Sequence, residues 1–374
     1  MTRVLVINSG SSSLKYEVLD AETAVSVTSG LIERIGVPGS PVPDHGVAIA
    51  GVLDALDADS IDAVGHRIVH GGSVFTQAAP IDDAVEAEIE RLAVLAPLHN
   101  PPGLLGIRAA RAALPHVPQV AVFDTAFHAT LPPEAYTYAI DAAVSAEFGV
   151  RRYGFHGTSY RYVSRRAAET LGRPLENLRM IVLHLGNGAS AAAIDGGRSV
   201  STSMGMTPLE GLVMGTRSGD LDPAVLLHLQ RVGGYDAASL DDLLNRSSGL
   251  KGLGGHSDMR DLIDAAEQGD AGAALAFEVY VRRLQKYIGA YAAELGGLDA
   301  LVFTAGVGEN SALVRARAVE PLGFLGVSVD DALNGGSSSN SRVISPSDSP
   351  VSVLVVPTNE ELQIALETVA VITP

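Results

Sequence analysis

The sequence predicts an α/β fold that contains two similar domains, and two hairpin patterns carry this prediction. Residues 4–7 form a β-branched run that ends in the glycine- and serine-rich stretch 8–13, and residues 14–19 then alternate between apolar and polar. This order is typical of two antiparallel strands joined by a tight turn. The same order returns at residues 180–194, about half a chain later. We interpret the repeat as a domain duplication; two unrelated hairpins are the alternative.

The elements around these hairpins alternate between strands and helices, which is the pattern of α/β domains. Helix signals are local: Asp82 and Asp83 fall in a first turn, and Asp222 places a capping residue before Pro223. We expect strands at residues 63–69, 117–123, 301–305 and 351–356, and helices at residues 82–95, 102–114, 224–232, 271–295, 312–319 and 360–369. Residues 201–220 show neither the period of a helix nor the alternation of a strand, yet they are too apolar for a disordered segment. We therefore expect a folded active-site loop there.

The composition excludes several classes of protein. Hydrophobic residues make up 47% of the chain, enough for a packed core. A net charge of −17 disfavours binding to nucleic acids and to anionic membranes, because both are held by clusters of Lys and Arg. The absence of cysteine excludes disulfides, thiolate nucleophiles and cysteine-ligated metals. No apolar run approaches the ~20 residues of a membrane span. We therefore expect a cytoplasmic protein without nucleic-acid or membrane partners.

Three glycine-rich loops indicate phosphate binding. Small residues let backbone N–H groups and hydroxyls approach phosphate oxygens closely. The first loop offers Asn8, Ser11, Ser13 and Lys15, the second spans residues 184–188, and the third spans residues 306–311 after a strand. For any one of them a plain turn is the simpler explanation, but three together favour a nucleotide site.

Arginines in glycine-rich or apolar surroundings are candidates for holding an anion. Burying an arginine costs several kcal/mol unless an anion pairs with it. Arg67 ends an expected strand, Arg217 lies in the irregular segment 201–220, and Arg151 and Arg152 precede a glycine-rich turn. Phosphoryl transfer needs such cations to position and neutralise the transferring group.

Two carboxylates follow expected strands, where open α/β sheets place their ligands. Asp124 follows residues 120–123, and Glu360 follows the stretch 356–359. Mg²⁺ prefers oxygen ligands and takes only one or two protein carboxylates. For Glu360, a role at the start of the last helix is an equally good explanation.

Several longer motifs resemble the acetate kinase family. They are Asn8–Lys15, His66–Gly72, Phe123–His128, Gly154–Ser159, Met204–Asp222, Phe303–Ser311 and Pro357–Glu361, and they span nearly the whole chain in the family's order. The resemblance implies the fold of the superfamily of acetate and sugar kinases, heat-shock proteins and actin: two duplicated actin-like (ribonuclease-H-like) domains with an active-site cleft between them. Residues 1–130 would form the first domain, completed by helix 361–374, and residues 131–360 the second, nucleotide-binding domain. The resemblance to the family also implies that the protein forms a homodimer.

The implied reaction is reversible, magnesium-dependent phosphoryl transfer between ATP and acetate, giving acetyl phosphate and ADP. By resemblance, Asn8 and Glu360 hold Mg²⁺, with Mn²⁺ as the alternative metal, and Arg67 binds the substrate carboxylate. Asp124 matches the catalytic acid, although acetate has no proton to lose at pH 7, so positioning of metal or arginine is an equal part of its role. His156 and Arg217 match the pair that stabilises the transition state, and the acetyl methyl would contact Val69, Leu98, Phe155 and Pro208.

The resemblance also implies the ATP contacts. They are Ser11, Ser13, Lys15, His184, Leu185, Gly186, Asn187, Gly188, Asp258, Met259, Arg260, Gly306, Val307, Gly308, Glu309 and Asn310, with segment 249–257 on the adenosine side. The chain departs from the family at Tyr160, where histidine is common, and at Ser201, where aspartate is common.

Two alternative functions stay open at this stage. Propionate and butyrate differ from acetate by one or two methylenes, and one methylene is worth only ~1–3 kcal/mol in a pocket. A non-catalytic nucleotide switch of the same superfamily is the second alternative. The joint presence of Arg67, Asp124, His156 and Arg217 favours the enzyme, because a switch does not need all four.

Overall fold

The computed structural model describes residues 2–10, 12–37, 39–56 and 60–373. The chain divides into two compact units. The first contains the chain up to Ala129, the segment Phe155–Tyr162 and the chain from Asn359 onward. The second contains Thr130–Gly154 and Val163–Thr358. Residues 155–162 therefore pack with the first unit, although they lie within the range 131–360.

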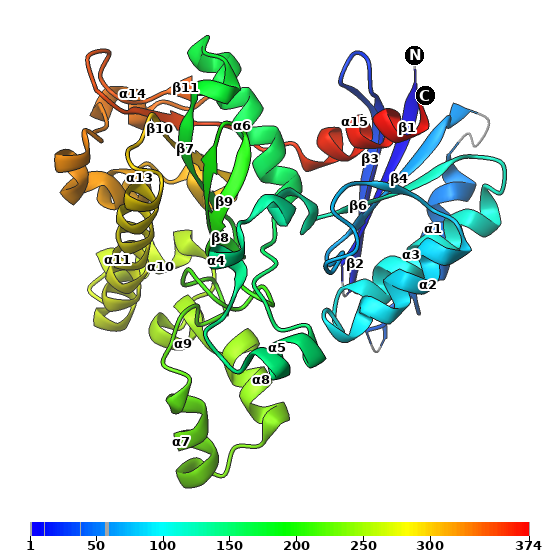
Figure 1. The fold of residues 1–374 in the computed structure, drawn as a ribbon, viewed down its shortest axis with the longest axis horizontal. Helices are drawn as coiled ribbons and strands as arrows, with labels where there is room; N and C mark the ends of the chain where they lie inside the picture. Colours follow the sequence, from blue (N-terminus) through cyan, green and yellow to red (C-terminus); the bar gives the residue numbers. More distant parts are fainter. Residues whose placement is uncertain (1, 11, 38, 57–59, 374) are drawn as a thin grey trace. The chain divides into compact units, whose positions relative to one another are not determined.

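The first unit contains a six-stranded sheet in the order β3-β2-β1-β4-β6-β5 (Figure 1). The predicted hairpin is its β1–β2 pair, and β1 is parallel to β4, which is parallel to β6. The strands are β1 (Arg3–Ser9), β2 (Ser13–Asp20), β3 (Val25–Glu33), β4 (Ala63–Ile68), β5 (Ala79–Pro80) and β6 (Gln119–Phe123).

The second unit repeats this sheet strand for strand. Its order, read from the antiparallel edge, is β9-β8-β7-β10-β12-β11, with the same sequence of parallel and antiparallel pairs. Even the irregularity recurs: the β2–β3 register shifts at Val18/Leu19 and the β8–β9 register at Ala193/Ile194. The predicted duplication is confirmed. The strands are β7 (Arg179–Leu185), β8 (Ala189–Asp195), β9 (Arg198–Thr202), β10 (Ala300–Thr304), β11 (Arg342–Val343) and β12 (Ser352–Val355).

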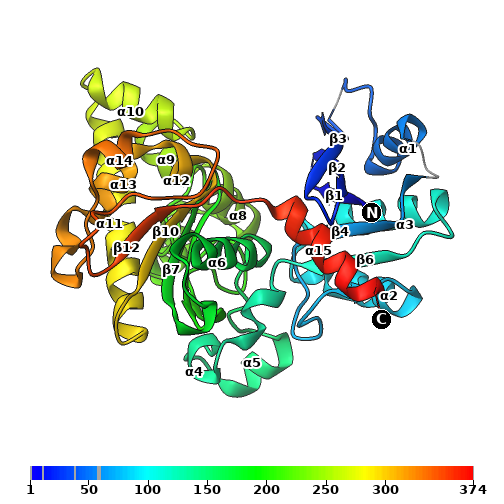
Figure 2. The same ribbon diagram turned by 90° about the horizontal axis from the view of Figure 1, so that it is seen from above.

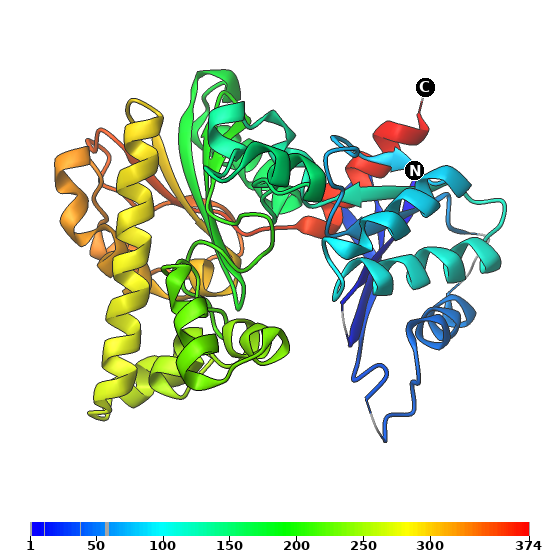
Figure 3. The same ribbon diagram turned by 60° about the horizontal axis from the view of Figure 1, so that its bottom comes forward.

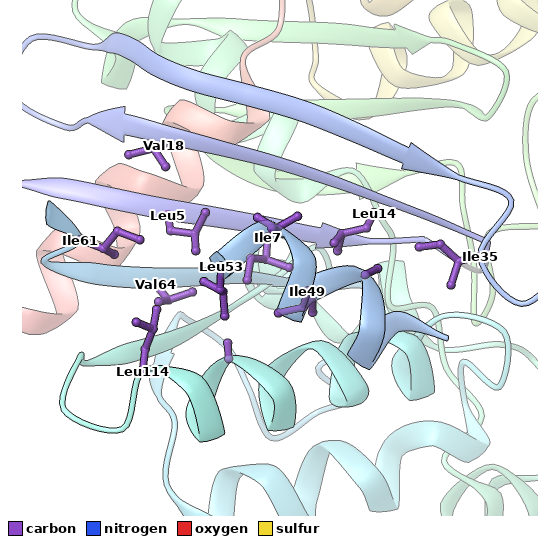
Figure 4. Close-up of a cluster of buried hydrophobic side chains, with 13 residues drawn as sticks. Leu5, Ile7, Leu14, Val18, Ile35, Ile49, Leu53, Ile61, Val64 and Leu114 are labelled. Carbon is purple, nitrogen blue, oxygen red and sulfur yellow. The ribbon is translucent and has the colours of Figure 1, made fainter. Parts of the chain in front are cut away.

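Helices cover both faces of the first sheet (Figure 2). Alternation along β1 sends Leu5 and Ile7 into one core, shared with α1 (His45–Ala55) and α3 (Asn100–Ala113), as Figure 4 shows. Val4 and Val6 enter the opposite core, which α15 (Glu360–Ile372) covers. α15 packs closely because Gly65 has no side chain: a Cβ there would lie 2.5 Å from the Thr368 hydroxyl.

The predicted helix 82–95 is shorter in the structure. Asp82 is the N-cap of α2 (Asp83–Arg91), its carboxylate accepting a hydrogen bond from the Val85 N–H, and a 3-10 turn, η2 (Leu92–Val94), follows. Asp83 lies in the first helical turn, where the helix dipole favours a negative charge. Asp82 is therefore a capping residue rather than part of the helix.

The second unit places α11 (Ala271–Glu294) against β7 and β8, and Figure 3 shows its length in yellow. α6 (Gly157–Leu171) begins in the first unit and ends in the second. The other helices are α4 (Pro133–Tyr136), α5 (Ala142–Phe148), α7 (Ala224–Gly233), α8 (Ala237–Arg246), α9 (Gly249–Gly254), α10 (Met259–Glu267), α12 (Ala305–Asn310), α13 (Ala312–Val319) and α14 (Asp331–Gly335), with 3-10 turns η3 (Ala126–Thr130), η4 (Leu175–Asn177) and η5 (Glu320–Leu325). Across the described residues, no helix combines the length and apolarity that crossing a membrane requires.

Two further expectations are corrected by the structure. The stretch 306–310, predicted as a glycine turn, is the short helix α12, entered through Ala305 at a left-handed φ of 64°. The irregular segment is shorter than predicted, because Ser201 and Thr202 pair with β8 as the end of β9. Most of the remaining loop is buried or half-buried, as a folded loop requires.

Candidate active site

The carboxyl ends of three parallel strands bring together Asn8, Arg67 and Asp124. Asn8 lies on β1 directly beside Arg67 on β4, and Asp124 follows β6. Arg67 is two residues from Gly65, so its side chain shares the sheet face that α15 covers. Open α/β sheets bind their ligands at such strand ends. The sheet order therefore assembles three of the predicted site residues.

Arg67 is held by a set of charge-assisted hydrogen bonds. Its Nε donates to Oδ1 of Asp124 at 3.2 Å, and Nη2 donates to Oδ2 at 2.5 Å. Its Nη1 donates to Oδ1 of Asn8 at 3.1 Å. Burial by itself would lower the pKa of Arg67, but the carboxylates of Asp124 and Glu360 raise the pKa above its usual value. The guanidinium is therefore a fixed, permanent cation.

Asp124 is itself oriented by the start of α6. The Thr158 hydroxyl donates to Oδ1 of Asp124 at 3.0 Å, and the Gly157 N–H donates to the Asp124 carbonyl at 2.9 Å. A Cβ on Gly157 would lie 2.2 Å from that carbonyl oxygen, so only glycine allows this approach. Asp124 is 1% exposed and reaches Arg67 and Thr158 with the same carboxylate.

His156 occupies a strained backbone position just before α6. Its φ is +58°, in the left-handed region that non-glycine residues rarely adopt, and its carbonyl accepts the Tyr160 N–H. Strain of this kind persists where surrounding contacts enforce it. Those contacts include buried Phe155, whose carbonyl bonds to His128 Nε2 at 3.0 Å. Tyr160, one of the departures from the family, is fully buried against the His128 ring.

The N-terminus of α15 adds two carboxylates to this face, and Lys15 on β2 adds a cation. Asn359 caps the helix by accepting the Leu362 N–H, which leaves Glu360 and Glu361 in the first turn. Burial raises the pKa of Glu360 to about 7; Asp124 and Glu361 add to this shift, while Arg67 opposes it. Lys15 forms an ion pair of 2.5 Å with Glu361.

The residues predicted to contact the acetyl methyl belong to both units. Val69 and Phe155 are buried in the first unit, where the Phe155 ring packs edge-on against His70 at 5.5 Å. Leu98 is 44% exposed in the same unit. Pro208 belongs to the second unit. Ser13 begins β2, and Ser11 lies outside the described residues.

The second unit contains a pocket of about 550 Å³ at the carboxyl ends of β7 and β10. Predicted nucleotide contacts line much of it: Gly186, Asn187, Asp258, Met259, Arg260, Gly306, Val307 and Asn310. Asp258 caps α10, and the Arg260 guanidinium donates two hydrogen bonds to its carboxylate. Those bonds, with the bond from the Arg260 backbone N–H, lower the pKa of Asp258 to about 2.

Other predicted nucleotide contacts are not among the lining residues: His184, Leu185, Gly188, Gly308 and Glu309. Glu309 serves the backbone instead, since its Oε1 accepts the Ala305 N–H at 2.8 Å and the Thr358 N–H at 3.1 Å. It therefore fixes the entrance to α12.

Arg217 lies in the irregular loop and donates from Nη1 to the Pro208 carbonyl at 2.8 Å. Burial lowers its pKa. Within the described parts of the chain, no carboxylate forms an ion pair with Arg217. A half-buried guanidinium without a carboxylate partner is suited to an anionic ligand.

The other two candidate arginines have structural roles, which corrects the expectation that they hold an anion. Arg152 donates to the carbonyls of Ser203 and Met204 and forms a 2.6 Å ion pair with Glu210. The guanidinium of Arg151 stacks on the Tyr136 ring at 3.6 Å. Both cations therefore have contacts within the protein, and Arg152 is paired with a carboxylate.

Residues 3–366 match the Acetokinase family. The chain belongs to this family. It is 59% identical over 387 residues to the acetate kinase of Leifsonia xyli subsp. xyli, covering 98% of each chain. It is 54% identical over 395 residues to the acetate kinase of Streptomyces avermitilis, covering 99% of this chain and 98% of that one.

Solved acetokinase structures agree with the fold. The acetate kinase of Porphyromonas gingivalis matches with a TM-score of 0.95 at 44% identity, covering all of both chains. A propionate kinase from Francisella tularensis matches with a TM-score of 0.94 at 39% identity, again over all of both chains.

Sequence analysis missed three residues that line the pocket at the carboxyl ends of β7 and β10: Gly215, Ile263 and Tyr280. Gly215 sits in the irregular loop, and a Cβ there would lie 2.1 Å from the Asn187 side chain. That loop was recognised as functional, so its glycines were a usable signal. Ile263 and Tyr280 carry no such signal, because apolar residues on α10 and α11 resemble core positions.

Proposed function

We propose that this protein is an acetate kinase that transfers the γ-phosphoryl group of ATP to acetate. A carboxylate oxygen of acetate forms a bond to the γ-phosphorus. The bond from that phosphorus to the bridging oxygen breaks, and ADP leaves with its electron pair, so the products are acetyl phosphate and ADP. The observation that carries the proposal is the fixed cation at Arg67, held by buried Asp124 and by Asn8.

The proposed roles follow from the charge of each side chain. Arg67 binds the acetate carboxylate, and Asp124 holds Arg67 in place. Arg217 and His156 neutralise charge on the transferring phosphoryl group, which supports catalysis by electrostatic stabilisation. Asp124 already accepts bonds from Arg67 and Thr158, so its main work is positioning.

Magnesium fits the first unit by its donor chemistry. Asn8 and Glu360 offer an amide and a carboxylate oxygen, and Mg²⁺ completes its shell with water and phosphate oxygens. Burial raises the pKa of Glu360 to about 7, the carboxylates of Asp124 and Glu361 add to the shift, and a divalent cation bound there would favour the ionised form. Bound there, Mg²⁺ would neutralise phosphate charge during transfer.

The nucleotide is proposed to bind in the pocket of the second unit. Gly186 and Gly306 leave room for phosphates, while Met259 and Ile263 offer apolar walls for the base. ATP and ADP are then the co-substrates of the enzyme, and the cytoplasm is the compartment that we expect to supply them. Lys15 is paired with Glu361, and because an ammonium has three N–H donors it can keep that partner and still contact a phosphate of ATP.

A homodimer is proposed on the basis of two apolar helices in the second unit. No residue of α5 or α7 is buried. Phe148 on α5 is 62% exposed, and Leu227 and Val232 on α7 are 56% and 73% exposed. Exposed apolar surface of this kind favours a protein partner. Sedimentation should show a dimer, and a monomer at micromolar concentration would contradict this assignment.

The function is tested by a phosphoryl-transfer assay with ATP and Mg²⁺. Acetate, propionate and butyrate are compared by kcat/KM at matched concentrations. The highest value for acetate supports the proposal. Preference for propionate or butyrate would keep the reaction and change the substrate; relatives of this chain include a propionate kinase. Nucleotide binding without any transfer would instead indicate a nucleotide switch.

A further inference from the structure

The loop that carries Arg217 is closed at its base by Gly211 and Asp220. The Gly211 N–H donates to Oδ1 of Asp220 at 2.9 Å, and the Asp220 N–H donates to the Gly211 carbonyl at 3.0 Å. Gly211 has a φ of 109°, and a Cβ there would lie 2.6 Å from the Ser203 carbonyl oxygen. Residues 211–220 therefore form a closed loop whose ends meet, with Arg217 inside it.

Two residues of α11 hold this base from outside the loop. Arg283 donates from Nη1 to the Gly211 carbonyl at 2.8 Å and from Nη2 to the Asp220 carbonyl at 3.1 Å. Tyr287, one helical turn later, donates its hydroxyl to Oδ2 of Asp220 at 2.9 Å. Residues four apart on a helix share one face, so a single rigid helix supplies both contacts.

The far end of the loop is tied to the nucleotide pocket. The Gly215 N–H donates to the Asn187 carbonyl at 3.0 Å, and the Leu250 N–H donates to the Met214 carbonyl at 2.9 Å. Gly215, Asn187 and Leu250 all line that pocket. Between the two attachments, Met214 N–H donates to the Arg217 carbonyl at 3.1 Å.

Packing alone does not hold the base of the loop. A second cavity of about 550 Å³ lies against it, with Asp220, Tyr287 and Tyr291 among its lining residues. On that side the loop faces open space, although Val200 and Ala290 also line the cavity. The hydrogen bonds of Asp220, Arg283 and Tyr287 therefore supply the directional restraint.

We propose that Asp220, Arg283 and Tyr287 form a clamp that positions Arg217 for phosphoryl transfer. This inference rests on the proposed function, because it assigns Arg217 to the transferring group. None of the three clamp residues needs to touch substrate: they act through the loop. A displacement of about 1 Å in a positioned group is enough to lower turnover by about 100-fold.

Kinetic constants of single and double variants test the clamp. Arg283→Ala should lower kcat by about 100-fold while the KM for ATP changes less than twofold, because the nucleotide pocket keeps its own contacts. Arg283→Lys should recover part of the loss, and Tyr287→Phe should lower kcat by about fivefold. Arg282→Ala is the matched control, since Arg282 is exposed on the same helix and should leave kcat unchanged.

A double variant separates positioning from general loosening of the fold. If Arg283 acts through Arg217, Arg217→Ala/Arg283→Ala should be no slower than Arg217→Ala alone. The proposal would be overturned if the losses in kcat of the two single variants multiply in the double variant. It would also be overturned if Arg283→Ala has the same kcat as the unmodified enzyme.

Hydrogen exchange tests the clamp independently of the proposed acetate kinase activity. Amides of residues 211–220 should exchange faster in Arg283→Ala than in Arg282→Ala, and equal exchange would overturn the clamp. If the unmodified enzyme transfers no phosphoryl group to any carboxylate, the proposed function fails, and exchange still measures whether Arg283 restrains the loop.

Discussion

Arg67 and Asp124 meet through two parallel hydrogen bonds, Nε to Oδ1 at 3.2 Å and Nη2 to Oδ2 at 2.5 Å. This two-point geometry fixes the plane of the guanidinium as well as its position. The third contact, from Nη1 to Asn8, leaves few directions in which the side chain can turn. A cation held this way is prepared for a planar carboxylate before substrate arrives.

Asp124→Asn should damage catalysis through Arg67. The amide cannot accept both guanidinium bonds, and its own NH₂ group faces a cation. We expect kcat/KM for acetate to fall by about 100-fold, since breaking one partner of a buried charge pair costs roughly 2–5 kcal/mol. The KM for ATP should stay within twofold. Steady-state kinetics with each substrate varied in turn would check this, and an unchanged acetate KM and kcat would contradict it.

Arg67→Ala and Arg217→Ala should separate binding from turnover. Arg67→Ala should raise the KM for acetate by at least tenfold, because it removes the proposed carboxylate contact. Arg217→Ala should lower kcat by about 1,000-fold with a much smaller change in the KM for ATP, as expected for an interaction made mainly in the transition state. Circular dichroism would confirm that both variants fold. Near-normal kinetics in both would mean that the site lies elsewhere.

The hairpins and the duplication could be predicted from sequence because strand alternation and glycine-rich tips are local signals. Helix α11 was predicted for the same reason, since its apolar positions recur along 24 residues. Helix α12 was not. Its glycines suggest a turn, and side-chain contacts stabilise it: Glu309 of the same helix accepts the Ala305 N–H, and Arg315 of α13 donates to the Gly308 and Glu309 carbonyls.

The individual residues of the site could be predicted from the sequence, but the contacts between them could not. Arg67 and Asp124 are 57 residues apart, and only the order of β1, β4 and β6 brings them together. The same limit explains Arg152: its sequence surroundings predict an anion-binding role, whereas in the fold it is paired with Glu210. Arg283 gave no signal, because an arginine on an amphipathic helix is ordinarily a solvent-facing charge.

Arg315→Met should destabilise the second unit around α12. Arg315 is 1% exposed and donates to Asn334 Oδ1 at 2.7 Å, the Asn334 carbonyl at 2.7 Å and the Gly308 carbonyl at 2.9 Å. Methionine fills much of the volume but leaves buried acceptors unpaired, at about 1–3 kcal/mol each. We expect a loss of about 3 kcal/mol, measured by thermal unfolding. Exposed Arg246→Met is the control and should change the unfolding midpoint little.

His66 should make the first unit lose stability in mild acid. Its ring is 1% exposed and bonds through Nε2 to Gln119 Oε1 at 2.9 Å. Burial lowers the pKa of His66 from 6.5 to about 4, with the Gln119 bond opposing the shift. Between these pH values the unfolded chain binds a proton at His66 that the folded chain does not. The contribution of His66 to the free energy of unfolding is therefore complete above pH 6.5 and is lost as the pH drops to about 4. The loss is roughly 3 kcal/mol, at 1.36 kcal/mol per pKa unit.

His66→Asn separates this contribution from the other titrating groups. Asparagine does not titrate, so the variant should show a weaker decline of the unfolding midpoint between pH 6.5 and 4 than the unmodified protein. His116→Gln is the control, because His116 is exposed and its removal should leave the decline unchanged. Parallel pH profiles for the unmodified protein and His66→Asn would show that His66 does not control acid stability. In that case the acid sensitivity would have to come from the buried carboxylates.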